Sequence, residues 1–113
     1  MDKLLYITNS MKYKYGGAVI NRRNYNLLHD IYEDNLFVYE FEYTNDETRF
    51  VKLKNRLTGL YFGITKQYIR DVLKIIEQQG INIVFISNSL FSCFANAIRK
   101  KFPDMVILSF FHN

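Results

Sequence analysis

Hydrophobic residues follow two alternating patterns along this chain: short continuous runs, and longer segments in which they recur every three or four positions. Continuous runs are typical of strands buried on both faces of a parallel sheet, whereas the longer periodicity is typical of helices with one apolar face. The runs predict strands over residues 3–8, 36–43, 81–87 and 105–111, with a further short strand over 50–53. The periodic segments predict helices over residues 21–33, 65–79 and 90–102.

Four residues set the expected limits of these helices. Asn21 and Ser89 are the predicted N-caps of the first and third helices, because their side chains can accept hydrogen bonds from free backbone N–H groups. Gly80 follows the second helix at the C′ position, where a left-handed backbone is common. Pro103 ends the third helix, because proline lacks the backbone N–H that a helix needs.

The alternation of strands and helices predicts an α/β protein: a Rossmann-like three-layer sandwich with a mostly parallel, open sheet and helices on both faces. The last strand is expected to lie inside the sheet, yet no helix follows it to cover a face. This ending indicates that the chain is part of a longer protein. The alternative is a small α/β domain that ends on a strand.

The composition narrows the class of protein. A length of 113 residues is enough for one domain, residues 1–113, and a hydrophobic content of 49% excludes a disordered chain. The single Cys excludes an internal disulfide framework and a thiolate metal cluster. No uncharged apolar run reaches about 18 residues, so the sequence predicts no membrane span. We therefore expect a soluble, cytoplasmic protein that could still contact the inner face of the cell membrane peripherally.

The basic residues fall mainly into three groups, at 12–23, 49–56 and 99–101, and the first group surrounds the loop after the first strand. Ligands of open α/β sheets bind beyond the carboxyl ends of the strands, and this loop lies there. It carries Gly16 and Gly17 before a helix, where glycine allows close backbone approach and the helix N-terminus favours anions. Basic residues surround the glycines without an acid among them: Lys12, Lys14, Arg22 and Arg23. Neither a dinucleotide fingerprint nor a P-loop is present. A phosphate-bearing ligand is one interpretation, and a flexible turn on a solvated basic face is the other.

His112 directly follows the last apolar run. A histidine at the end of a buried strand suits hydrogen bonding or acid–base chemistry. A purely structural role remains the alternative.

Several segments together resemble the N-terminal half of GT-B glycosyltransferases, especially the family 4 enzymes of bacterial polysaccharide synthesis. The matching segments are Lys-Leu-Leu-Tyr-Ile-Thr at 3–8, Gly16-Gly17 leading into a helix with Arg22 or Arg23, Ile-Val-Phe-Ile-Ser-Asn-Ser-Leu at 83–90, Ile-Arg-Lys-Lys-Phe-Pro at 98–103 and Val-Ile-Leu-Ser-Phe-Phe-His-Asn at 106–113. The closing Phe-Phe-His-Asn is the most specific of these. The resemblance covers most of the chain and is weakest over residues 44–64.

This resemblance implies an acceptor-side domain that works with a second, C-terminal Rossmann-like domain holding most of a nucleotide-sugar. Sugar transfer would retain the anomeric configuration and need neither a metal nor a further cofactor. The acceptor would be a sugar or a lipid diphosphate at the inner face of the cell membrane. By the same resemblance, Gly16 and Gly17 lie near the donor diphosphate and the acceptor, His112 lies near the transferred sugar, and Arg22 and Arg23 hold an acceptor phosphate. Without the C-terminal domain, this chain is expected not to catalyse transfer.

The sequence also departs from the family and leaves other functions open. Asn88 and Ser92 stand where family members often carry an Asp and a Gly, so the resemblance gives that loop no role. A non-enzymatic flavodoxin-like or receiver-like interaction module is one alternative, although the first strand lacks the acidic end that a receiver pocket needs. A basic nucleic-acid-binding domain is another, with Tyr13 and Tyr15 beside lysines as its support. We expect no nucleic-acid partner.

Overall fold

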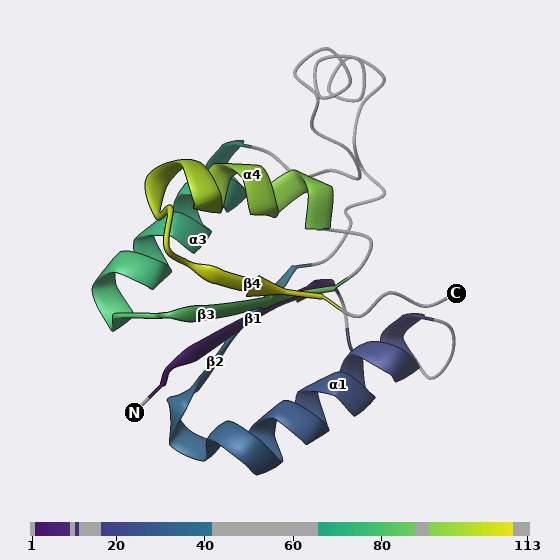
Figure 1. Cartoon of the computed structure of the whole chain (residues 1–113). Helices are drawn as coiled ribbons and strands as arrows, with labels where there is room; N and C mark the ends of the chain where they lie inside the picture. Colours follow the sequence, from purple (N-terminus) through teal and green to yellow (C-terminus); the bar gives the residue numbers. More distant parts are fainter. Residues whose placement is uncertain (1, 10, 12–16, 42–65, 88–90, 110–113) are drawn as a thin grey trace, which may run out of the picture.

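The computed structural model describes residues 2–9, 11, 17–41, 66–87 and 91–109 (Figure 1). Within these ranges the strands are β1 (Leu4–Asn9), β2 (Leu36–Phe41), β3 (Ile83–Ile86) and β4 (Val106–Leu108). The helices are α1 (Gly17–Tyr32), the short 3-10 helix η1 (Glu33–Asn35), α3 (Lys66–Gln79) and α4 (Phe91–Lys101). The predicted strand over 50–53 and the predicted N-cap Ser89 lie outside the described residues.

The strands form one parallel sheet in the order β2-β1-β3-β4. Helix α1 covers one face, and α3 and α4 lie together over the other (Figure 1). The predicted fold class is therefore confirmed: the chain is an α/β protein whose layers are consistent with a Rossmann-like sandwich.

Strand β1 is buried on both faces, because its side chains alternate between the two layers of helices. Leu5 and Ile7 point into the core beneath α3 and α4. Leu4 and Tyr6 point into the core beneath α1. None of the four is more than 1% exposed, which explains why the sequence shows a continuous apolar run at this position.

Helix α1 begins one turn earlier than the apolar pattern predicts, so the prediction of Asn21 as its N-cap is wrong. The helix starts at Gly17, and Asn21 lies inside it with its side chain buried. The face of α1 that packs on the sheet carries two asparagines, Asn21 and Asn24, before its first large apolar residues. A polar stretch of this kind hides the start of a helix from an analysis of hydrophobic periodicity.

The ends of the other two helices agree with the predictions to within one residue. Helix α3 stops at Gln79, and Gly80 takes the left-handed conformation with φ +66°, as its predicted C′ position requires. Helix α4 stops at Lys101, two residues before Pro103. None of the described helices is both long and apolar enough to cross a membrane.

Strand β4 corrects the prediction of an interior strand at the end of the chain. In the described part of the sheet, β4 is an edge strand paired only with β3, and it spans Val106–Leu108 rather than 105–111. Val106 and Leu108 are 50% and 45% exposed. The apolar run here reflects one buried face and one open face, which a continuous run cannot distinguish from burial on both.

A hydrogen bond between β2 and α3 joins the outer strand to the helical layer. The Tyr39 hydroxyl donates to Oδ2 of Asp71 at 3.2 Å. Burial raises the pKa of Tyr39 above its ordinary value of 10.0, and the negative charge of Asp71 raises it further. Because the folded-state pKa is raised, the associated stability is present in full below pH 10.0 and is lost as the pH rises above that value.

Replacing Tyr39 with Phe tests this contact. We expect the free energy of unfolding to fall by about 1 kcal/mol at neutral pH, because the site is partly exposed and the acceptor is charged. The difference from wild type should shrink above pH 10.0, where the unfolded tyrosine loses its proton. Urea unfolding across this pH range measures both effects. Tyr25→Phe is the matched control, and equal losses in the two variants would contradict the assignment.

Candidate functional site

The strand order changes direction between β1 and β3. The chain passes from β1 through α1 to β2 on one side, and later enters β3 on the other side of β1. In open parallel sheets the connections diverge at such a switch, and a crevice for ligands opens beyond the carboxyl ends of the two strands. Here that crevice position lies beyond Asn9 and Ile86, next to the start of α1 (Figure 1).

A buried cluster of polar side chains lies at this switch. The Ser87 hydroxyl is 3.0 Å from Oγ1 of Thr8 and 3.3 Å from Oδ1 of Asn21. All three residues are buried, and the backbone N–H of Ser87 donates to the carbonyl of Ile7 at 2.9 Å. The cluster therefore ties the ends of β1 and β3 to the second turn of α1. Among the described residues, no buried polar side-chain atom lacks a hydrogen-bond partner.

Arg22 and Glu40 lie on the β2 side of the switch. The guanidinium of Arg22 donates to the backbone carbonyl of Met11, and the N–H of Met11 donates to Oε1 of Glu40 at 3.1 Å. These contacts hold Met11, which follows β1, between the helix and the end of β2. On the other side, the Ser109 hydroxyl donates to the Ile86 carbonyl at 2.7 Å. Polar groups thus border the carboxyl edge on both sides.

The structure brings part of the predicted site together. Gly17 is the first residue of α1 and is exposed, and a Cβ placed on it would meet no atom within 4 Å. The N–H groups of a first helical turn have no partner within the helix, and they favour an anion. Arg22 is partly buried at this edge, and Arg23 is exposed. The other two predicted residues, Gly16 and His112, lie outside the described residues.

Sequence reasoning did not identify Thr8 and Asn21 as parts of this edge. Thr8 is a polar residue at the end of an apolar run, and Ser87 is another. Since parallel strands end at the same edge, a hydroxyl residue closing each of two buried runs is a usable signal for a shared polar site. Asn21 gave no such signal, because the pattern placed it at the helix start.

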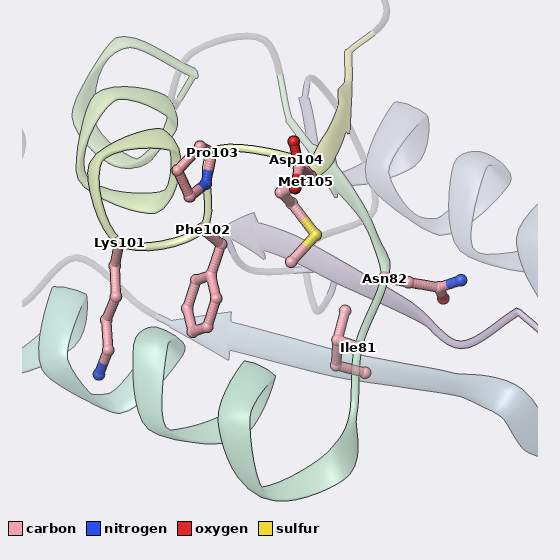
Figure 2. A pocket seen from close by; sticks show the side chains of 7 residues that line it. All are labelled: Ile81, Asn82, Lys101, Phe102, Pro103, Asp104 and Met105. Carbon is pink, nitrogen blue, oxygen red and sulfur yellow. The ribbon is translucent and has the colours of Figure 1, made fainter.

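A pocket of about 340 Å³ lies at the opposite edge of the sheet, near the amino ends of β3 and β4 (Figure 2). Figure 2 shows the side chains that line it: Ile81, Asn82, Lys101, Phe102, Pro103, Asp104 and Met105. Two of its polar groups already have partners. Asn82 donates to Asp2 and accepts from the N–H of Lys3, and Lys101 pairs with Glu77 at 3.2 Å.

The two edges differ in what they offer a ligand. The amino-edge pocket is mainly apolar, and its amide and ammonium groups serve internal contacts. The carboxyl edge has a helix N-terminus, a polar cluster and an arginine. Within the described ranges, no group of His, Cys, Asp and Glu could hold a metal ion. We take the carboxyl edge as the candidate functional site.

The polar cluster predicts non-additive effects of substitution. Ser87→Ala removes the hydroxyl shared by Thr8 and Asn21 and should lower the free energy of unfolding by about 1–2 kcal/mol. Thr8→Val should lower it similarly. The double variant should lose less than the sum of the single losses, because fewer buried groups are left without a partner. Urea unfolding of all four proteins gives the coupling free energy, and strictly additive losses would show that the cluster does not act as a unit.

No family model matches the chain, and no curated protein or solved structure matches it either.

Proposed function

We propose that this chain is the acceptor-side, Rossmann-like domain of a retaining GT-B glycosyltransferase, and that it binds phosphate-bearing substrate at its carboxyl edge. The observation that carries the proposal is the coincidence of three features at one place. The strand order switches between β1 and β3, α1 begins there with an exposed glycine, and Arg22 lies on the same edge. The sequence resemblance implies the reaction, and the geometry of this edge supports the proposal of an anion site.

The first turn of α1 is suited to a diphosphate. Its free backbone N–H groups and the positive end of the helix dipole favour negative charge, and Gly17 adds no side chain to block approach. The buried Thr8–Ser87–Asn21 cluster fixes the next turn of the helix relative to the strand ends. Such preorganised donors stabilise charge that develops as the diphosphate leaves.

The remaining roles in the proposal come from the resemblance. His112 and Gly16 complete the site beside the transferred sugar and the donor diphosphate, and Arg22 and Arg23 hold an acceptor phosphate. A C-terminal domain holds most of the nucleotide-sugar. The acceptor is a sugar or a lipid diphosphate at the inner face of the membrane. The transfer uses no metal.

The strand order favours a second candidate. The order β2-β1-β3-β4 is that of flavodoxin-like domains, which also bind phosphate groups at the switch. In this case the chain is a non-enzymatic interaction module. Both candidates use the same edge of the sheet, so a binding experiment tests the site but does not distinguish the two functions. An assay of sugar transfer distinguishes them.

A titration followed by NMR tests where a phosphate-bearing ligand binds. We expect uridine diphosphate and inorganic pyrophosphate to shift the backbone amide signals of Gly17 to Asn21 and of Ser87 in ¹⁵N spectra of the protein. Arg22→Gln should weaken binding about three- to tenfold, since one charge-assisted contact is lost. Arg22→Lys should retain part of it, and Lys74→Gln, on the far face of the sheet, should bind as wild type does. Shifts centred on the Ile81–Met105 pocket, or none, would contradict this site.

Sugar transfer tests the reaction. In the whole protein that carries this chain, His112→Ala should lower kcat by about 100-fold, because a hydrogen-bond donor or acid–base group at the reacting sugar is removed. His29→Ala is the control, since His29 lies on the exposed side of α1. The assay follows release of nucleoside diphosphate with acceptor present. Unchanged transfer in His112→Ala removes this residue from the site, and absence of transfer in the wild type favours the interaction module.

A further inference from the structure

Among the described residues, no helix covers the β4 side of the sheet face on which α1 packs. Parallel sheets normally carry helices over both faces, and α1 packs chiefly on β1 and β2. Val106 and Leu108 of β4 align with Ile83 and Phe85 of β3, whose side chains pack in the core on the α1 side. They therefore point to the same face as α1, where they are about half exposed.

One flank of α1 is also apolar and exposed. Ile20, Leu27 and Ile31 are 37%, 51% and 71% exposed. At about 100° per residue they lie within a sector of roughly 40° on the helix surface. Arg22 lies on the opposite flank, about 160° from the middle of this sector, and it reaches Met11 beside β2. The apolar flank therefore faces the β3 and β4 side.

Both features lie on the same side of the sheet, and we call their exposed apolar residues together the α1–β4 surface. Its apolar residues are Ile20, Leu27, Ile31, Val106 and Leu108. Exposed aliphatic side chains gathered in one place, rather than scattered singly, are typical of an interaction surface.

Two charged residues of α1 lie beside this surface and indicate which kind of partner would fit it. Arg23 and Asp30 are exposed and lie along its outer border. They are seven positions apart, or about 10 Å along the helix axis, which is too far for them to pair within one helix. Neither has an ion-pair partner among the described residues.

The α1 sequence is complementary to itself when two copies run antiparallel. With a twofold axis near the middle of the helix, Ile20 of one copy lies beside Ile31 of the other, and the two Leu27 side chains meet near the axis. Arg23 of each copy then lies beside Asp30 of the other. A parallel arrangement would instead place like charges together, so the charge pattern selects the antiparallel one.

We propose that the α1–β4 surface is a self-association interface, in which two copies of the chain pack their α1 helices antiparallel about a twofold axis. Each copy contributes the same patch, as isologous interfaces require. The antiparallel helices point their N-termini in opposite directions, so the two carboxyl edges lie at opposite ends of the dimer. In this arrangement Arg23 pairs with Asp30 of the other copy, so in the dimer the acceptor phosphate assigned above to Arg22 and Arg23 would be held by Arg22 alone.

The first test measures the association state. Sedimentation equilibrium between about 1 and 100 μM should show a concentration-dependent monomer–dimer equilibrium. Leu27→Glu should raise the dissociation constant more than about tenfold, because the twofold axis brings two carboxylates into the apolar centre. His29→Glu adds the same charge on the opposite flank of α1 and should leave the constant unchanged. A wild-type monomer throughout the range overturns the proposal.

The second test exchanges the charges. Arg23→Asp and Asp30→Arg should each raise the dissociation constant about three- to tenfold, since both create like-charge contacts across the axis. The double variant restores opposite charges and should return to within about twofold of wild type. Circular dichroism confirms that each variant is folded, which we expect because both positions are exposed. A double variant that dissociates as readily as the single ones overturns the antiparallel pairing.

Discussion

The phenol of Tyr6 sets the position of α1, and much of the molecule depends on it. Tyr6 lies at 0% exposure in a strand covered on both faces, so its hydroxyl must find a hydrogen-bond partner inside the protein. It donates to the backbone carbonyl of Asn21 at 3.1 Å, within α1 itself. The edge-to-face contact between Tyr6 and Phe85 links the same ring to β3. Tyr6 thus connects β1 and β3, the two strands at the switch, with helix α1.

The contact of Tyr6 with α1 explains why the polar carboxyl edge and the apolar α1–β4 surface lie at different places. With Asn21 held over the end of β1, the first turn of α1 lies at the carboxyl edge, and the Asn21 side chain reaches the Thr8 and Ser87 hydroxyls. The same placement leaves the β4 side of the face without a helix among the described residues. The polar carboxyl edge and the exposed apolar surface beside α1 are therefore both consequences of where this helix is fixed.

The pattern of hydrophobic residues correctly predicted those strands and helices that contribute residues to the core. Leu5, Val72 and Phe94 belong to segments in which burial dictates residue type, and their strands and helices were predicted within a few positions. The start of α1 was not, because Asn21 is buried for its hydrogen bonds rather than its hydrophobicity. The edge position of β4 was not, because strand order is a tertiary property. Of the predicted site, Gly17, Arg22 and Arg23 are described and Gly16 and His112 are not, and the roles of all five remain predictions.

The pairing of β1 with β3 also constrains how the chain can fold. Leu4 pairs with Ile83, so β1 and its neighbour β3 are separated by most of the length of the chain. The β1–α1–β2 unit can form early from contacts close in sequence, but the loop that brings β3 to it closes slowly. During synthesis, β1 is made long before β3. Until β3 arrives, a strand that is buried on both faces in the folded protein has one open edge, and in that interval the nascent chain is most exposed to misassociation.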